Sequence, residues 1–190
     1  MATEVQARTA DRRYQPIKLG EAQLANIRIR RPLWTELEAV IDLRTELFTP
    51  YTRRRISRQE RRRDVDPNTV HSAAFEGAQI IDTGLICPDP EDLEAMSMFN
   101  VYAVGVHPKY RRQGIGAKVV SYLEERAISL GATDIYLSAN NTAIGFYEKL
   151  GYHVRELLPS RNRETPMHKT LDPKLAELFM IADASPEGAS

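Results

Sequence analysis

Residues 104–118 read V-G-V-H-P-K-Y-R-R-Q-G-I-G-A-K, and this stretch decides the fold. An apolar strand, predicted over residues 96–106, runs directly into a turn that carries Gly114 and Gly116. An amphipathic helix is predicted to follow over residues 114–130, because apolar side chains recur there at helical spacing. A strand, a glycine turn and a helix in direct succession indicate a layered domain that contains both α and β structure.

The glycine turn has the residues that an anion site requires. Glycine lacks a Cβ, so the backbone can bend tightly at Gly114 and Gly116 and approach a ligand. The N–H groups of the first helical turn, together with the helix dipole, attract phosphate oxygens, and Arg111, Arg112 and Lys118 add positive charge. The pattern alone leaves a simple helix cap open, because the stretch lacks the full G-x-G-x-x-G of a dinucleotide fold.

Hydrophobic periodicity predicts the element order β-α-α-β-β-β-α-β-α-β-β. The first strand is I-R-I-R at residues 27–30. The helix after it is expected to be capped by Thr35 and to end at Pro50, which cannot donate a backbone hydrogen bond. A β-hairpin is expected to turn at Gly77.

The length of 190 residues favours one domain with ordinary tails. We expect a flexible lead-in at residues 1–20, the domain at residues 21–171 and a helical tail at residues 172–190. With 42% hydrophobic and 27% charged residues, and no apolar run near the roughly 20 residues of a membrane-spanning helix, the composition is that of a soluble protein. Charges among the first residues argue against a secretion signal, so we expect a cytoplasmic protein that binds no membrane.

Cysteine and histidine usage argues against a disulfide or a metal site. Cys87 is the single cysteine, so no intrachain disulfide can form, and burial as a small apolar side chain is the expected role. The four histidines are dispersed, and none pair at the spacing that would place two imidazoles on one helical face. We therefore expect no metal.

Two motifs together resemble a known family. Val106, Pro108, Arg111, Gly114 and Gly116 follow the pattern V-x-P-x-x-R-x-x-G-x-G, which is similar to the signature of the GNAT acyltransferase superfamily. Residues 140–152, N-N-T-A-I-G-F-Y-E-K-L-G-Y, resemble that family's downstream block. The resemblance implies a GNAT fold of class α/β (α+β), with a central, mixed, mostly antiparallel twisted sheet of six to seven strands flanked by about four helices.

The resemblance also implies acetyl-CoA as co-substrate and assigns residues to it. The turn amides of this family bind the pyrophosphate of coenzyme A, while the preceding strand pairs with the pantetheine and directs the N–H of Val106 toward the acetyl carbonyl. An asparagine at the end of the next strand, here Asn140, contacts the cofactor as well. The implied cofactor-binding residues are Val104, Gly105, Val106, Arg111, Arg112, Gln113, Gly114, Ile115, Gly116, Ala117 and Asn140.

Tyr147 is the expected general acid, because it matches the family tyrosine near the thioester sulfur and a thiolate leaves more easily once protonated. Packing in the core is the alternative role for an F-Y pair on a helix. Many family members carry a glutamate on the strand before the turn, but this chain has no carboxylate at residues 100–103. The general base stays open, with Asp66, His71, Glu76 and His107 as substitutes that the sequence cannot place.

An arginine-rich stretch at residues 53–63, R-R-R-I-S-R-Q-E-R-R-R, lies where this family forms the wall of its acceptor site. Arg54, Arg58, Arg61 and Arg62 would share one helical face and could hold an acidic acceptor, with Arg58 and Arg62 as the candidate substrate-binding residues. A solvated face balanced by nearby acids is the alternative. Nucleic-acid binding is not expected, because the net charge is zero and no aromatic residue interleaves the arginines.

The predicted function is an acetyl-CoA-dependent N-acetyltransferase that acylates a primary amine of a small molecule or peptide by direct transfer in a ternary complex. The alternatives are a non-catalytic CoA-binding sensor or interaction module, and an acyltransferase that uses a longer acyl-CoA. Members of the family often dimerise, so the resemblance leaves room for a homodimer.

Overall fold

The computed structural model describes residues 17–52, 58–155 and 164–172 of the chain. Its helices are α1 (Glu21–Ala25), α2 (Leu37–Thr52), α3 (Arg58–Asp64), α4 (Ile115–Ser129) and α5 (Ile144–Glu148), with short 3-10 turns η1 (Trp34–Glu36) and η2 (Pro108–Tyr110). Its strands are β1 (Ile27–Arg30), β2 (Val70–Glu76), β3 (Gln79–Pro88), β4 (Met98–Val106), β5 (Asp134–Asn140), β6 (His153–Val154) and β7 (Glu164–Thr170).

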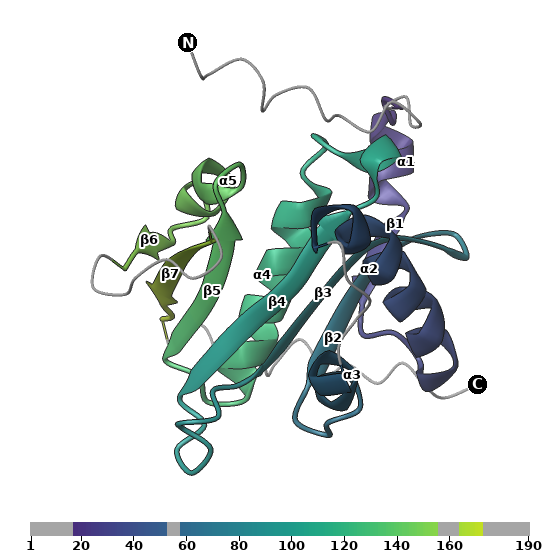
Figure 1. The fold of residues 1–190 in the computed structure, drawn as a ribbon. Coiled ribbons are helices and arrows are strands. Elements are labelled where there is room, and N and C mark those ends of the chain that lie inside the picture. The colour runs from purple at the N-terminus through teal and green to yellow at the C-terminus, as the bar shows by residue number, and fades with distance from the viewer. Residues whose placement is uncertain (1–16, 53–57, 156–163, 173–190) are drawn as a thin grey trace, which may run out of the picture.

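Within the described residues, seven strands form one sheet in the order β1-β2-β3-β4-β5-β7-β6. Only β4 and β5 pair in parallel, and every other neighbouring pair in this sheet is antiparallel. Helices α2 and α3 cover one face of the sheet, and α4 lies against the other (Figure 1). The predicted mixed, mostly antiparallel GNAT sheet is confirmed.

Helix α4 supplies the largest part of the core on its side of the sheet. Val119, Val120, Leu123 and Ala127 are buried, as their helical spacing predicts. Gly84 of β3 lies directly beneath them: a Cβ there would come within 3.0 Å of Leu123 Cδ1. Gly84 therefore permits close approach of helix and strand, and a larger residue would force the helix outward.

The predicted element order is confirmed from β1 onward, but it omits α1, and the predicted start and end of the first long helix are wrong. Thr35 lies inside η1 rather than capping the helix, and the turn begins at Leu33. Helix α2 continues through Pro50 to Thr52. A proline this close to the end of a helix removes one of the last backbone hydrogen bonds and leaves the earlier turns intact.

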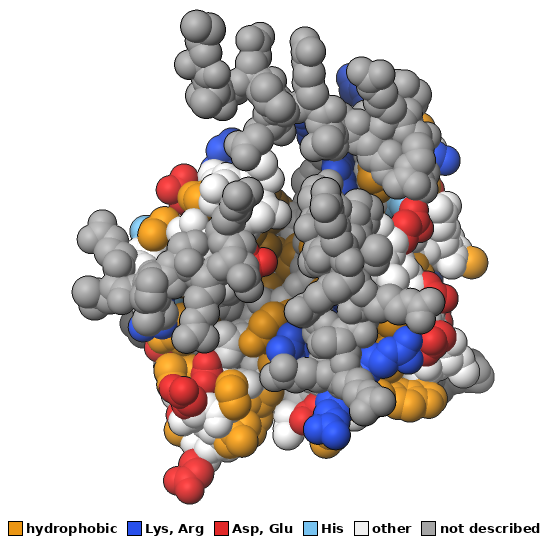
Figure 2. All heavy atoms as spheres, viewed as in Figure 1, with side chains coloured by type: hydrophobic (Ala, Val, Ile, Leu, Met, Phe, Trp, Pro, Cys, Tyr) orange, Lys and Arg blue, Asp and Glu red, His pale blue; other side chains and the backbone are white. Residues whose placement is uncertain are grey.

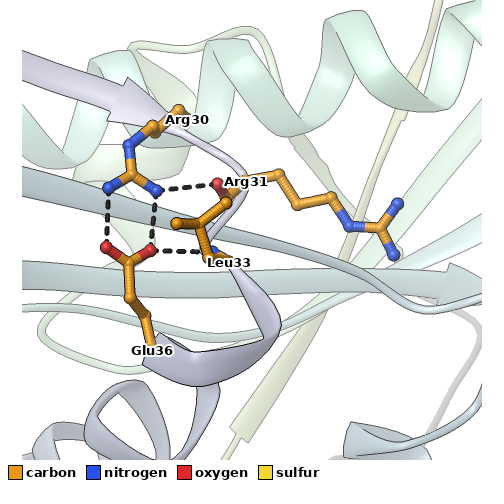
Figure 3. Close-up of polar contacts among 4 residues, drawn as sticks. All are labelled: Arg30, Arg31, Leu33 and Glu36. Carbon is orange, nitrogen blue, oxygen red and sulfur yellow. Dashed lines mark hydrogen bonds and ion pairs between the residues drawn. The ribbon is translucent and has the colours of Figure 1, made fainter.

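An ion pair fixes the start of α2 to the end of β1 (Figure 3). The Arg30 guanidinium donates to both carboxylate oxygens of Glu36 at 2.7 and 2.8 Å, and its carbon lies 3.8 Å from the centre of the Phe75 ring. Glu36 also accepts from the backbone N–H of Leu33 at 2.7 Å. The hydrogen bond from Arg30 is the main reason that the pKa of Glu36 falls to about 2. The contact therefore holds η1, the turn that leads into α2, against the end of β1.

Two features are absent from the residues that the structure describes. None of the helices in this part of the chain is long and apolar enough to cross a membrane. No three of its His, Cys, Asp or Glu side chains come together as a metal site would require. Cys87 is half-buried, and burial raises the pKa of its thiol to about 11, so it stays protonated at neutral pH.

Candidate active site

The centre of the sheet opens where β4 and β5 separate. The two strands pair only from Met98 to Asn100 on β4, opposite Asp134 to Tyr136 on β5. Beyond Asn100 they diverge (Figure 1), and the described chain offers residues 101–106 no other strand on that side. Figure 2 shows hydrophobic side chains in the hollow between β5 and β4. The unpaired edge of β4 is therefore available to an extended ligand with its own amide groups.

A β-bulge distorts β4 beside this opening. Thr83 and Leu85 of β3 face Gly105 and Tyr102 of β4, so three steps on β4 match two on β3. The bulged segment of β4 includes Ala103, whose φ of +53° is unusual for a residue with a side chain. Gly105 itself faces α2, where an added Cβ would come within 3.0 Å of Phe48. The positive φ of the bulge therefore lies two residues before Gly105.

The backbone of Val106 points into the opening. His107 N–H donates to the Ile81 carbonyl of β3 at 2.8 Å. Successive residues of a strand direct their N–H and C=O groups to opposite sides, so the groups of Val106 point away from β3, toward the gap left by β5. The Arg111 guanidinium donates to the Val106 carbonyl at 3.0 Å. The N–H of Val106 is thereby directed at the place where β4 and β5 separate.

The turn between β4 and α4 forms an exposed N-terminal helix end. Gly114 is the N-cap of α4 with φ +79°, and Arg112 also has a positive φ, of +63°. A Cβ at Gly114 would meet nothing within 4 Å, so the glycine is required by its backbone angle and the space beside it is open. The first N–H groups of a helix have no acceptor inside it. In α4 these free N–H groups belong to Ile115, Gly116 and Ala117.

Gly116 is required for a different reason than Gly114. An added Cβ would lie 3.2 Å from Val106 Cγ2 and 3.6 Å from Phe146 Cζ. The absence of a side chain lets the first turn of α4 pack against β4 and α5 at once. The two glycines of the motif therefore have different roles: Gly114 allows the positive backbone φ, and Gly116 allows close packing.

The charged side chains of the turn are exposed. Arg111, Arg112 and Lys118 all face solvent around the end of α4, where they would add to the attraction of a phosphate. The Gln113 side chain instead accepts from the backbone N–H of Leu19 at 2.8 Å and donates to the Ile17 carbonyl at 3.2 Å. Leu19 is buried in the core. The end of the predicted lead-in thus lies against this turn.

Asn140 and Tyr147 lie on the other side of the opening. Asn140 ends β5, and its Oδ1 accepts from Thr142 N–H at 3.1 Å and from Thr142 Oγ1 at 2.7 Å, which shapes the turn into α5. Tyr147 is 8% exposed, and its ring lies edge-on to those of Phe146 and Tyr152, with centroids 4.9 and 5.6 Å away. Burial, and secondarily the charge of Asp82, raises the pKa of Tyr147 to about 12.

Asp82 is a site residue that sequence reasoning missed. It lies on β3 opposite Val106, is fully buried, and has one carboxylate oxygen 3.8 Å from the position of a Cβ on Gly116. Neither oxygen has a hydrogen-bond partner among the described residues. Burial raises the pKa of this carboxyl to about 8, and the nearby N–H groups of Thr83 and Gly105 only partly offset that effect. A single acid inside the apolar run I-I-D-T-G-L-I was the available signal.

The four substitutes for a general base lie apart from one another. Glu76 accepts from the Tyr110 hydroxyl at 2.6 Å, and Asp66 is exposed in the turn after α3. His71 is buried, donates through Nε2 to the Asp64 carbonyl at 2.9 Å and faces Arg44 through Nδ1. His107 directly follows β4, and burial is the main cause of its lowered pKa. Of the four, His107 lies nearest along the chain to Val106.

An open groove of about 370 Å³ lies beside His107, on the α2 side of the sheet. Its walls come from α2 and from the hairpin between β2 and β3, and its lining includes the carboxylates of Asp42 and Glu46. Two acids next to a neutral imidazole would favour a positively charged amine there. No sequence pattern predicts this groove, because its residues are far apart along the chain.

Helix α3 carries part of the arginine-rich stretch, and residues 53–57 lie outside the described residues. Arg61 and Arg62 are exposed, and Figure 2 shows Lys and Arg side chains on this face around the position of α3. Arg58 lies in the backbone of α3, but its side chain is outside the described residues. Arg63 stacks on the Tyr102 ring of β4, 3.6 Å from its centre. The stretch thus forms a helix attached to β4 next to the opening.

A buried ion pair holds the end of α3 to α2. The Arg44 guanidinium of α2 bonds to the Asp64 carboxylate, and both side chains are almost completely buried. Burial is the main cause of the lowered pKa of His71, which keeps this neighbouring imidazole neutral near pH 7. The buried ion pair between Arg44 and Asp64 therefore holds α2 and α3 together.

Solved structures share this fold. A GNAT-family acetyltransferase of Staphylococcus aureus superposes with a TM-score of 0.63 at 17% identity, covering 77% of this chain and 99% of that one. An aminoglycoside 6'-N-acetyltransferase complexed with coenzyme A gives a TM-score of 0.64 at 19% identity, covering 77% and 98%. The fold is that of the acyl-CoA N-acyltransferases.

The family model described as the acetyltransferase (GNAT) family matches residues 37–152. This span is more than half of the chain, so the chain belongs to the acetyltransferase (GNAT) family.

Curated relatives match a shorter segment. An acetyltransferase of Pectobacterium atrosepticum is 41% identical over 56 residues, which is 28% of this chain and 40% of that protein. An acetyltransferase of Yersinia pestis is 34% identical over 62 residues, or 31% and 44% of the two chains. The chain spans less than half the length of these relatives.

Proposed function

We propose that this protein transfers an acetyl group from acetyl-CoA to a primary amine of a small molecule or peptide, by direct transfer in a ternary complex. The observation that carries the proposal is the opening between β4 and β5, which ends at the exposed N-terminus of α4. Membership of the GNAT family and a solved neighbour complexed with coenzyme A support it.

The residues around the opening fit coenzyme A. The open space beside Gly114, the N–H groups of α4 and three exposed cations suit a pyrophosphate. The unpaired edge of Val104, Gly105 and Val106 suits the amides of a pantetheine arm. Coenzyme A would supply an acyl group activated as a thioester. The N–H of Val106 would stabilise the negative charge that develops on the carbonyl oxygen, and Tyr147 would donate a proton toward the sulfur.

The acceptor is proposed to bind against α2 and α3. Exposed Arg61 and Arg62 would attract an acid group on the acceptor, with Arg58 and Arg62 as candidate contacts. The groove with Asp42 and Glu46 would attract the amine itself. An acceptor with both an amine and an acid group would bind the groove through its amine and the arginines through its acid group. A homodimer is compatible with this arrangement.

Thiol release from acetyl-CoA with a panel of amines tests the proposal. We expect release that depends on both substrates, and a melting temperature raised by acetyl-CoA in the absence of any amine. Cys87 gives a low background, because burial keeps its thiol protonated. A melting shift without thiol release for any amine would favour a non-catalytic CoA-binding module, and a panel of longer acyl-CoAs would reveal a different donor.

A further inference from the structure

Two arginine side chains lie over tyrosine rings beside the opening between β4 and β5. Arg63 of α3 has its guanidinium carbon 3.6 Å from the centre of the Tyr102 ring on β4. Arg155, which directly follows β6, has its guanidinium carbon 5.0 Å from the centre of the Tyr136 ring on β5. Stacking on an aromatic face restricts a guanidinium and leaves the N–H groups at its edge able to donate. The proposed function gives neither of these stacked pairs a role.

The two tyrosines lie on the same face of the sheet. Their neighbours Val101 on β4 and Ile135 on β5 are buried in the core together with apolar side chains of α4. Side chains alternate along a strand, so Tyr102 and Tyr136 point to the opposite face, where α3 lies. Tyr136 pairs with Asn100, two residues before Tyr102. The two stacked pairs are therefore about 7 Å apart along the strands, at the point where β4 and β5 separate.

Neither of these guanidinium groups has an ion-pair partner among the described residues. Arg30 and Arg44, by comparison, are each paired with a carboxylate. Arg63 is half-buried, and the residue after it, Asp64, is fixed by the buried ion pair that holds α3 to α2. A guanidinium that is held in place without an acid partner is suited to bind an anion from outside the chain.

The charges around the stacked pairs favour a carboxylate over a phosphate. Burial is the main cause of the raised pKa of both Tyr102 and Tyr136, and Asp89 is a smaller cause in each case. The Asp89 carboxylate accepts a hydrogen bond from the Asn100 side chain at 2.8 Å. An acid near both rings would repel a doubly charged phosphate more strongly than a singly charged carboxylate.

The distance from the stacked pairs to Val106 limits the length of the acceptor. Tyr102 and Val106 lie opposite Leu85 and Asp82 of β3, which are three residues apart. Three residues of a strand span about 10 Å. The N–H of Val106 is directed at the place where the acyl group is proposed to lie, so the amine must reach that place while its acid group stays at the arginines. An amine and a carboxylate attached to the same carbon are too close together for this.

We propose that Arg63 and Arg155 bind the carboxylate of the acceptor and thereby select an amine that is separated from its carboxylate by a chain of several atoms. An ω-amino acid, or a peptide with a side-chain amine, has this form. The proposal rests on the proposed function and adds two contacts to the acceptor site. Tyr102 and Tyr136 are positioning residues, because they act through the arginines that they hold.

The first test compares the KM of ε-aminocaproate with that of its amide, ε-aminocaproamide, and with that of glycine. In wild type, ε-aminocaproate should have a KM about tenfold below the other two, since hydrogen bonds to a charged group contribute an effect of that size. Arg63→Gln and Arg155→Gln should each raise the KM of ε-aminocaproate about tenfold and leave that of the amide unchanged. Arg28→Gln combined with Arg31→Gln, both exposed at the β1 edge of the sheet, is the control and should change neither KM.

The second test changes the rings under the arginines. Tyr102→Phe and Tyr136→Phe keep an aromatic face, so the KM of ε-aminocaproate should stay within about twofold of wild type. Tyr102→Leu and Tyr136→Leu remove that face and should raise this KM about threefold. The KM of the amide and the melting shift caused by acetyl-CoA should stay as in wild type in all four variants, which a general loss of folding would not produce.

Calorimetry on the complex with coenzyme A, which carries no acyl group, measures acceptor binding without turnover. ε-Aminocaproate should bind to wild type, and Arg63→Gln and Arg155→Gln should each weaken that binding about tenfold. Equal binding by wild type and variants, equal KM values for the acid and its amide, or stronger inhibition by inorganic phosphate than by acetate would overturn the proposal. If no amine released thiol from acetyl-CoA while this binding and its loss in the variants persisted, the proposed function would be wrong and the carboxylate site would remain.

Discussion

Two regions of the molecule differ in whether their buried ionisable side chains are paired. In the proposed acceptor wall, which we define as α2 and α3, the buried Arg44 and Asp64 form an ion pair next to a neutral His71. On the proposed cofactor side, which we define as β4, α4, β5 and α5, cations are exposed at the turn. The buried acid that faces this side from β3, Asp82, has no hydrogen-bond partner for its side chain among the described residues. A paired buried charge holds elements together, whereas a buried acid without a charged partner keeps its proton near neutral pH, as the raised pKa of Asp82 indicates.

The difference predicts which substitutions damage the fold and which damage function. Changes to the paired charges of the acceptor wall should lower stability first. Changes on the cofactor side should lower binding or rate while the protein stays folded. Substitutions in both regions test this division, from the largest expected effect to the smallest.

Asp64→Asn should produce the largest loss of stability. The change leaves the Arg44 guanidinium buried without its carboxylate, and breaking a buried ion pair costs about 3–5 kcal/mol. Urea unfolding at pH 7 measures the loss. Asp66→Asn is the matched control, because Asp66 is exposed two residues further on, and it should change stability by less than about 0.5 kcal/mol. Equal effects of the two variants would show that the buried pair does not hold the wall.

Tyr147→Phe should lower kcat about 100-fold, a typical contribution of a general acid, and leave the melting shift by acetyl-CoA in place. The ring contacts with Phe146 and Tyr152 are preserved by phenylalanine, so the fold should survive. Tyr122→Phe, on the half-buried side of α4, serves as the control with unchanged kcat. A rate within twofold of wild type would assign Tyr147 to packing only.

Charge reversal of Arg58 and Arg62 to glutamate should raise the KM of an acidic acceptor about fivefold, the effect of one exposed charge pair of about 1 kcal/mol. Coenzyme A affinity should not change, because these residues lie on the acceptor wall. The double reversal of Arg28 and Arg31 to glutamate, both exposed at β1 or directly after it, controls for net charge. A larger response to Glu46→Gln than to the arginine reversal would identify the groove beside His107 as the main acceptor contact.

Glu36→Gln should have the smallest effect, and its dependence on pH is the informative part. Arg30 lowers the pKa of Glu36 to about 2 in the folded protein, below the ordinary glutamate value of 4.5. The stabilisation is therefore complete above a pH of about 4.5 and is lost as the pH falls toward about 2. The melting difference between wild type and variant should shrink over that range, with Glu38→Gln, exposed in the first turn of α2, as the control.

Local patterns were sufficient for most of the fold. Period-two and helical spacing predicted the strands and α4, and the glycine at residue 77 predicted the hairpin, because each of these depends on residues close in sequence. Helix α1 was missed, since it has only five residues and no buried side chain. The end of α2 was missed because Pro50 lies in its last turn, where a proline removes only one backbone hydrogen bond.

The candidate site was predictable only where it is continuous in sequence. The turn of Gly114 and Gly116 could be recognised, whereas contacts across the fold could not. Gln113 bonds to Leu19, which lies 94 residues away. In the sequence, Asp82 resembles an ordinary polar residue of a strand. Its exclusion from water, and the absence of a hydrogen-bond partner for its carboxyl group among the described residues, result from the packing of β4 and α4 around it.

The affinity of coenzyme A for wild type, Gly114→Asp and Gly114→Asn, measured by calorimetry, tests the central claim most directly. Asp and Asn both tolerate the positive φ at this position, and the space beside it is open, so the two variants differ mainly in charge. We expect Gly114→Asp to weaken binding by well over tenfold, about 1.4 kcal/mol or more, and Gly114→Asn to retain most of the affinity. Unchanged affinity in Gly114→Asp would contradict a phosphate site at the start of α4.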